Sequence, residues 1–89
     1  MEIFKVSRKI SIVCNYENKT NGFRHRATLM YDGRELEEST SSYQNRTWEN
    51  YTYQSAMFEL IRKVEKNKSL SPEEIKKCNR AIKHRSFLK

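Results

Sequence analysis

The chain has 89 residues, of which 36% are hydrophobic and 33% are charged, and its formal net charge is +7. No apolar run approaches the ~20 residues of a membrane-spanning helix. The N-terminal residues also lack the extended apolar stretch of a signal peptide, so we expect none. With ten aromatic residues, the composition excludes disorder as well as a membrane protein, and it predicts one soluble, cytoplasmic domain over residues 1–89.

Two alternating segments open the chain. Residues 4–16 place apolar side chains at every second position, interrupted at Arg8, and residues 23–31 repeat the pattern after a turn over residues 17–22. Period-two alternation is typical of strands with one solvent-exposed face. Cys14 and His25 fall on the apolar side, where we expect core packing, whereas Arg24 and Arg26 fall on the open side.

A tight hairpin is predicted at Asp32-Gly33, because this dipeptide tolerates the positive φ angles of a type I′ turn. A two-residue turn pairs residue 31 with 34, Leu29 with Leu36, and Thr28 with Glu37. The third strand then runs from residue 34 to about residue 42. The sequence therefore predicts a three-stranded antiparallel sheet over residues of about 3–43.

The first predicted helix covers residues of about 50–66. Apolar side chains recur there at i, i+3 and i+4, the spacing of an amphipathic helix that covers a sheet. Asn50 and Thr52 are both candidates for its N-cap.

The second predicted helix covers residues of about 72–85, and several start signals coincide at its N-terminus. Ser71 is the N-cap, Pro72 takes the first helical position, and Glu74 closes a capping box. Leu70 and Ile75 flank the cap as a hydrophobic staple. The predicted fold class is therefore α+β, a three-stranded sheet followed by two helices, the second of them basic.

The excess positive charge lies entirely in the last third of the chain. Residues 1–60 contain eight Lys/Arg and eight Asp/Glu, whereas residues 61–89 contain ten against three. In the second helix Lys76, Arg80 and Lys83 share a face, and Lys77 lies beside them. Such an array would neutralise the phosphates of a nucleic acid. The plainer interpretation is a solvated face that keeps a small protein soluble.

Residues 43–54 contain four aromatic side chains, one arginine and several amides within twelve positions. Tyr, Trp and Arg are enriched at binding hot spots. We therefore expect Arg46 and Tyr51 to contact a partner, and Trp48 and Tyr53 to close the core where the sheet meets the first helix.

The pattern Tyr-x-Asn-Arg-Thr-Trp-Glu-x-Tyr-x-Tyr-Gln-Ser, from Tyr43 to Ser55, resembles a group of short bacteriophage and prophage proteins. In that group a similar stretch follows a strand with an Arg-Ala-Thr element, here Arg26-Ala27-Thr28, and precedes an amphipathic helix. The resemblance covers roughly residues 23–64. It implies a phage setting in the cytoplasm of a bacterial host, and it transfers no activity, because the group has no established chemistry.

No catalytic motif is recognised. The two histidines, His25 and His84, lie outside known motifs, and Cys14 and Cys78 lack the spacing of metal ligands. A Gly-rich phosphate loop and a nucleophile elbow are absent from the sequence. We therefore expect no enzyme, no cofactor and no metal, and two reduced, partly buried thiols.

Three functions remain open. The preferred one is a small, basic, non-catalytic phage-type protein that binds nucleic acid or a host nucleoprotein complex. Its predicted nucleic-acid contacts are Lys76, Lys77, Arg80, Lys83, Arg24 and Arg26. The alternative is an anti-defence protein, for example an anti-CRISPR inhibitor, that docks on a host protein through Arg46 and Tyr51. A small virion component is the third. No membrane partner is expected, and the sequence leaves DNA versus RNA, and the oligomeric state, open.

Overall fold

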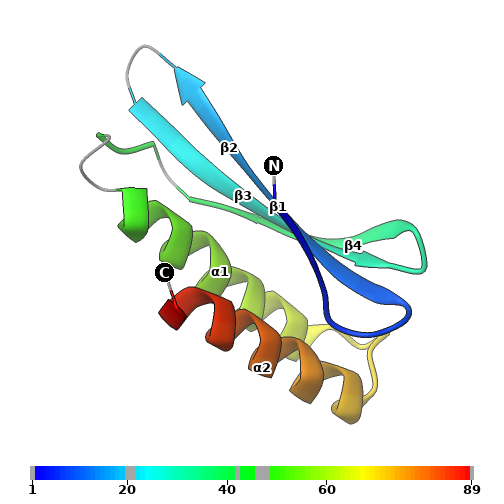
Figure 1. Ribbon diagram of the computed structural model, residues 1–89. Helices are drawn as coiled ribbons and strands as arrows, with labels where there is room; N and C mark the ends of the chain where they lie inside the picture. Colours follow the sequence, from blue (N-terminus) through cyan, green and yellow to red (C-terminus); the bar gives the residue numbers. More distant parts are fainter. Residues whose placement is uncertain (1, 20–21, 42, 46–48, 89) are drawn as a thin grey trace.

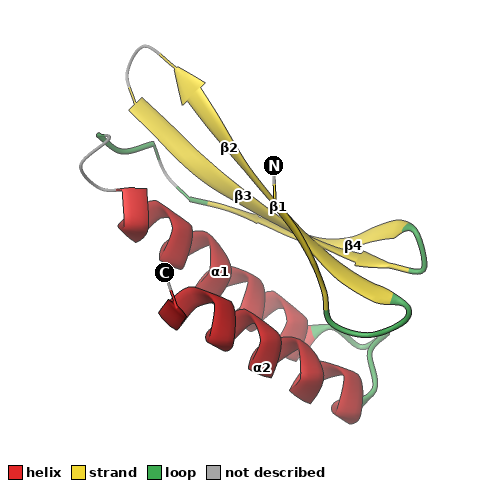
Figure 2. Cartoon of the chain, viewed as in Figure 1, coloured by secondary structure: helices red, strands yellow, loops and turns green. Residues whose placement is uncertain are grey.

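The computed structural model describes residues 2–19, 22–41, 43–45 and 49–88, which form a four-stranded antiparallel sheet with two helices on one face (Figures 1 and 2). The strands β1 (Glu2–Lys5), β2 (Ile10–Lys19), β3 (Gly22–Tyr31) and β4 (Arg34–Thr40) lie in the sheet in chain order. The helices are α1 (Glu49–Lys66) and α2 (Pro72–Leu88). The α+β class and the order of sheet before helices are confirmed.

The prediction of three strands is wrong, because the first alternating segment is a hairpin. β1 and β2 run antiparallel, and the N–H groups of Val6 and Ser7 both donate to the carbonyl of Ile10, at 2.9 and 3.1 Å. Phe4 pairs with Ile12, and directly opposed residues share a face of the sheet. The apolar parity therefore continues across the turn, so alternation alone does not reveal the reversal.

The turn between β3 and β4 has the predicted geometry. Asp32 and Gly33 have φ angles of 54° and 82°, as a type I′ turn requires, and Tyr31 pairs with Arg34.

The register beyond that turn differs from the prediction. Met30 pairs with Glu35, but Leu29 pairs with Glu37 and Thr28 with Glu38, so the predicted partners Leu36 and Glu37 are each wrong by one residue. The cause is a β-bulge, which places one extra residue in β4. That residue, Leu36, packs against the core.

The core lies between the inner face of the sheet and both helices. Its buried side chains are Ile10, Ile12, Cys14, Ala27, Leu29, Tyr53, Ala56, Met57, Leu60, Ile61, Val64, Leu70, Cys78 and Ile82. Two hydrogen bonds also join α1 to β4: Ser39 Oγ donates to the carbonyl of Ala56, and Lys63 Nζ donates to the carbonyl of Glu38. The apolar stripe predicted for the first helix is therefore confirmed.

The start of α1 agrees with the predicted start at about residue 50, but both predicted N-cap candidates are wrong. The helix begins at Glu49, so Asn50 and Thr52 both lie within its first turn. Thr52 is fully buried, and its hydroxyl oxygen lies 2.9 Å from Nδ1 of His25 on β3. Thr52 therefore joins the helix to the sheet instead of capping the helix.

The start of α2 has the predicted capping box. Ser71 Oγ accepts a hydrogen bond from the Glu74 N–H at 3.2 Å, and Glu74 Oε1 accepts one from the Ser71 N–H at 2.9 Å. Glu74 Oε2 accepts a further hydrogen bond of 2.8 Å from the Tyr31 hydroxyl on β3. The hydrogen bond from the Ser71 backbone, and then that from Tyr31, hold the pKa of Glu74 below its usual value. This carboxylate therefore both caps α2 and ties it to the sheet.

Replacement of Gly22 by alanine should destabilise the fold more than replacement of Gly33. Both glycines have positive φ, +129° and +82°, which costs about 1–3 kcal/mol for a residue with a Cβ. A Cβ at Gly22 would also collide with the carbonyl of Gln44, whereas one at Gly33 meets nothing within 4 Å. Urea unfolding measures the loss of folding free energy in each variant. Equal losses of folding free energy for Gly22→Ala and Gly33→Ala would contradict the close approach of Gln44 to β3.

The Glu74→Ala variant should lose about 1–2 kcal/mol of folding free energy, because it removes the capping acceptor and the partner of the Tyr31 hydroxyl. Glu73→Ala is the matched control, since Glu73 is exposed in the same first turn of α2. Urea unfolding followed by circular dichroism checks the difference. Equal destabilisation by the two variants would show that Glu74 acts through general charge alone.

Candidate functional site

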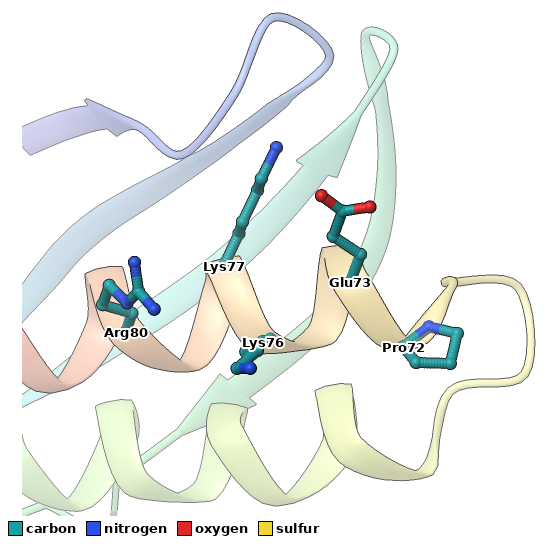
Figure 3. Close-up of a pocket in the computed structure, with 5 residues that line it drawn as sticks. All are labelled: Pro72, Glu73, Lys76, Lys77 and Arg80. Atoms are coloured by element: carbon teal, nitrogen blue, oxygen red, sulfur yellow. The ribbon is translucent and has the colours of Figure 1, made fainter.

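The exposed side of α2 carries four of the predicted nucleic-acid contacts. We call this set the basic face: Lys76, Lys77, Arg80 and Lys83, all of them exposed. Three of these residues line an open hollow of about 500 Å³ together with Pro72 and Glu73 (Figure 3). Lys77 and Glu73 extend to the same side of the helix in that view.

The rotation of α2 is set by its apolar edge. Cys78 and Ile82 are fully buried, and Ile75 packs partly buried against the same cluster. At 100° per residue, the residues of the basic face are centred on the opposite side of the helix from this edge. Burial of the edge therefore turns the cations toward solvent.

Among the described residues, the cations of the basic face have no carboxylate partner. Within the described part of the chain, ion pairs form at Arg24, Arg26 and Arg62, and no carboxylate oxygen lies within 4.0 Å of a charged nitrogen of the basic face. The acid beside them, Glu73, is itself exposed. The basic face therefore offers its charges to solvent or to an anionic partner.

Arg24 and Arg26, the other predicted nucleic-acid contacts, lie on the open face of the sheet and are paired within the molecule. The two carboxylate oxygens of Glu17 lie 2.9 Å from Arg24 Nη2 and 2.9 Å from Arg26 Nη2. Arg26 Nε lies 2.9 Å from Glu38 Oε1. The Tyr43 hydroxyl donates to Glu17 at 3.1 Å, and the Tyr43 ring lies 4.6 Å from the guanidinium carbon of Arg24. We call these five residues the Glu17 network.

The Glu17 network limits what its arginines contribute to a nucleic-acid site. Hydrogen bonds from Arg24 and then Tyr43 hold the pKa of Glu17 below its usual value, so the carboxylate is charged at neutral pH. Each arginine thus has an anionic partner already, and the structure does not bring either of them to the basic face. Sequence reasoning missed Glu17 and Tyr43. It placed Glu17 in a turn over residues 17–22, whereas β2 continues to Lys19, and extending the outward parity of the first segment to position 17 was a usable signal.

The aromatic segment divides between core, surface and a part outside the described residues. Arg46, a predicted partner contact, and Trp48, a predicted core residue, both lie outside the described residues. Tyr51, the other predicted contact, lies in the first turn of α1 with 53% of its surface exposed. Tyr53 is buried as expected, and its ring meets the His25 ring edge-on, with 5.4 Å between centroids.

The thiols have a packing role in this structure. Cys14 and Cys78 are both buried thiols that take part in no disulfide among the described residues, and Cys14 Sγ lies 3.9 Å from Met57 Sδ. Burial raises the pKa of Cys78 to about 11, so its thiolate, the reactive form, is scarce at neutral pH. Among the described residues, no cluster of three or more His, Cys, Asp or Glu side chains is arranged to hold a metal ion.

Comparisons with known proteins found no match to this chain among protein-family models, curated proteins or solved structures. In the part of the chain that the structure describes, no helix combines the length and the apolar character needed to cross a membrane. The function is therefore inferred from the residues themselves, and the basic face is the candidate site.

The Glu17→Gln variant should show how the Glu17 network stabilises the sheet. Because the pKa of Glu17 is lowered from 4.5 in the folded state, the network stabilises the fold above that pH and loses its contribution as the pH falls through the lowered value. Wild type should therefore be more stable than Glu17→Gln near neutral pH, and the difference should shrink in acid.

Urea unfolding at several pH values from about 7 to about 3 measures this difference. Glu35→Gln, an exposed glutamate on β4, is the control. A difference for Glu17→Gln that stays constant with pH would show that ionised Glu17 does not support the fold.

Proposed function

We propose that the protein is a small non-catalytic binding protein whose basic face binds the phosphate backbone of a nucleic acid, free or within a nucleoprotein complex. One observation carries this proposal: four exposed cations without carboxylate partners among the described residues lie on one side of an anchored helix. Surface lysines that serve only solubility do not require such an anchored arrangement.

The spacing of the cations suits a polyanion. Lys76 and Lys83 are separated by about 10 Å along the axis of α2, since each residue rises about 1.5 Å. Duplex DNA carries one negative charge per about 1.7 Å of its axis, so each cation on this length of helix has a phosphate within reach. The open shape of the hollow beside the basic face also favours an extended backbone over an enclosed small molecule.

The same residues predict little base selectivity. Lysine and arginine side chains that neutralise phosphates fix the position of a protein on nucleic acid, whereas sequence is read at base edges. The basic face consists of cations alone, and Arg24 and Arg26 are held in the Glu17 network on the open face of the sheet. Binding is therefore expected to be strongly dependent on salt and weakly dependent on sequence.

From the resemblance of residues 43–55 to phage and prophage proteins, we further propose that this activity is carried out in the cytoplasm of an infected bacterium. There the partner would be phage or host nucleic acid, or a host complex that contains it.

An anti-defence protein that docks on a host protein is a second candidate, and the exposure of Tyr51 supports it. Aromatic side chains that are exposed on a folded surface are common anchors in protein interfaces. Capture from host lysate with and without nuclease separates the two candidates. A partner lost on nuclease treatment supports nucleic-acid binding, and a protein partner that survives it supports docking.

The salt dependence of binding to a fluorescent duplex tests the basic face directly. Four phosphate contacts predict a slope of log K against log salt of about −3.6. The Arg80→Gln variant should reduce the slope by about 0.9, because one contact is removed. Anisotropy titrations at several salt concentrations measure both values, with labelled single-stranded RNA as a second probe.

Arg34→Gln is the matched control for Arg80→Gln, because it removes the same charge from an exposed position in the β3–β4 hairpin. A slope near zero for the wild type, or an equal reduction of the slope by the two variants, would contradict binding through the basic face. Point variants are preferable to deletion of the C-terminal helix, since Leu70, Cys78 and Ile82 belong to the core.

A further inference from the structure

A second surface of the molecule lies on α1 and has different chemistry. We call it the α1 solvent face, and six residues line it: Tyr51, Gln54, Ser55, Phe58, Glu59 and Arg62. They surround an open hollow of about 320 Å³. Tyr51 and Phe58 are among the large hydrophobic side chains that are exposed, at 53% and 38%.

The α1 solvent face points away from the core. The buried residues of α1 are Tyr53, Ala56, Met57, Leu60, Ile61 and Val64. At 100° per residue, the six residues of the α1 solvent face are centred on the opposite side of the helix from these. The core therefore does not require large aromatic side chains at positions 51 and 58. The exposed surface of these two side chains is therefore available for contact with another molecule.

The residues of the α1 solvent face complement one another when two copies of the helix are placed antiparallel. A two-fold axis between positions 56 and 57 brings position 51 opposite 62, 54 opposite 59, and 55 opposite 58. Tyr51 then meets the guanidinium of the second copy's Arg62, an arrangement that favours a cation–π contact.

The other two pairs are complementary as well. Gln54 faces the second copy's Glu59, so that an amide N–H₂ meets a carboxylate. Ser55 faces the second copy's Phe58, so that a small side chain leaves room for a large one, as interdigitated helix packing requires. Each contact occurs twice in such a pair, because the interface is isologous.

The charge of the α1 solvent face also permits two copies to approach. Its acid and base, Glu59 and Arg62, lie 3.7 Å apart as an i, i+3 ion pair, so the face carries no net charge, whereas the whole chain carries +7. The remaining repulsion between two cationic copies acts over a distance and is screened by salt. We propose that the α1 solvent face is a self-association surface, on which a second copy of this chain docks with its α1 antiparallel.

This inference is independent of nucleic-acid binding by the basic face, and the two respond to salt in opposite directions. Binding of a polyanion weakens as salt is added. Self-association should hold or tighten, because salt screens the repulsion between the copies. A single helix face is small for a dimer interface, so the dimer should form and dissociate with protein concentration.

Sedimentation equilibrium of the full chain over about a hundredfold range of concentration tests the proposal. Wild type should show a reversible monomer–dimer equilibrium, and Phe58→Glu should weaken it about tenfold or more. Arg34→Glu is the control, with the same side chain introduced in the β3–β4 hairpin and no effect expected beyond charge. A wild-type chain that stays monomeric throughout, or a dimer that Phe58→Glu leaves unchanged, overturns the proposal.

A cross-linking experiment tests the orientation while leaving Tyr51 and Phe58 in place. Gln54→Cys and Glu59→Cys proteins are mixed under mild oxidation, while the buried Cys14 and Cys78 remain in the core. The antiparallel pairing predicts mainly the mixed disulfide between positions 54 and 59. Predominance of the 54–54 and 59–59 disulfides would indicate parallel pairing, and absence of cross-links would indicate that this face binds a different molecule; either result overturns the proposal.

Discussion

Burial of the narrow apolar edge of α2 is the constraint on which the candidate site depends. Cys78 and Ile82 are fully buried, and burial of an isoleucine side chain is worth about 1.5–3 kcal/mol. No rotation of α2 keeps these side chains inside and turns Lys76 or Arg80 inward as well, because they lie on opposite sides of the helix. Glu74 adds a directional contact at the N-terminus, through Ser71 and Tyr31. The cations are thus held outward by the burial of this edge in the core.

The cationic side chains of the molecule have two different electrostatic roles. On the open face of the sheet, Arg24 and Arg26 share Glu17, and Arg26 also meets Glu38, so these charges join β2, β3 and β4. On α2, the cations of the basic face have no such partners among the described residues. A count of positive residues treats both groups alike. Their availability to an external phosphate differs, because the paired arginines would first have to separate from a carboxylate.

The two helices expose surfaces of different kinds. α2 presents charge, and its interaction with a polyanion would be long-ranged and sensitive to salt. α1 presents Tyr51 and Phe58 beside a compensated ion pair, and its contacts would be short-ranged. A chain of 89 residues can therefore carry two independent interaction surfaces, because both helices need only one side each to cover the sheet.

The sequence by itself determined the features that arise from neighbouring residues: the type I′ turn at Asp32-Gly33, the capping box of Ser71 and Glu74, the apolar stripe of α1 and the outward side of α2. These features depend on periodicity and on hydrogen bonds between residues close in the sequence, so the order of residues is enough to predict them. The tertiary structure alone decided the reversal between β1 and β2, the bulge at Leu36, the bond between Thr52 and His25, and the pairing of Arg24 and Arg26 with Glu17. Each of these depends on which distant segments lie side by side, and parity and spacing along the chain are the same whether or not those segments meet.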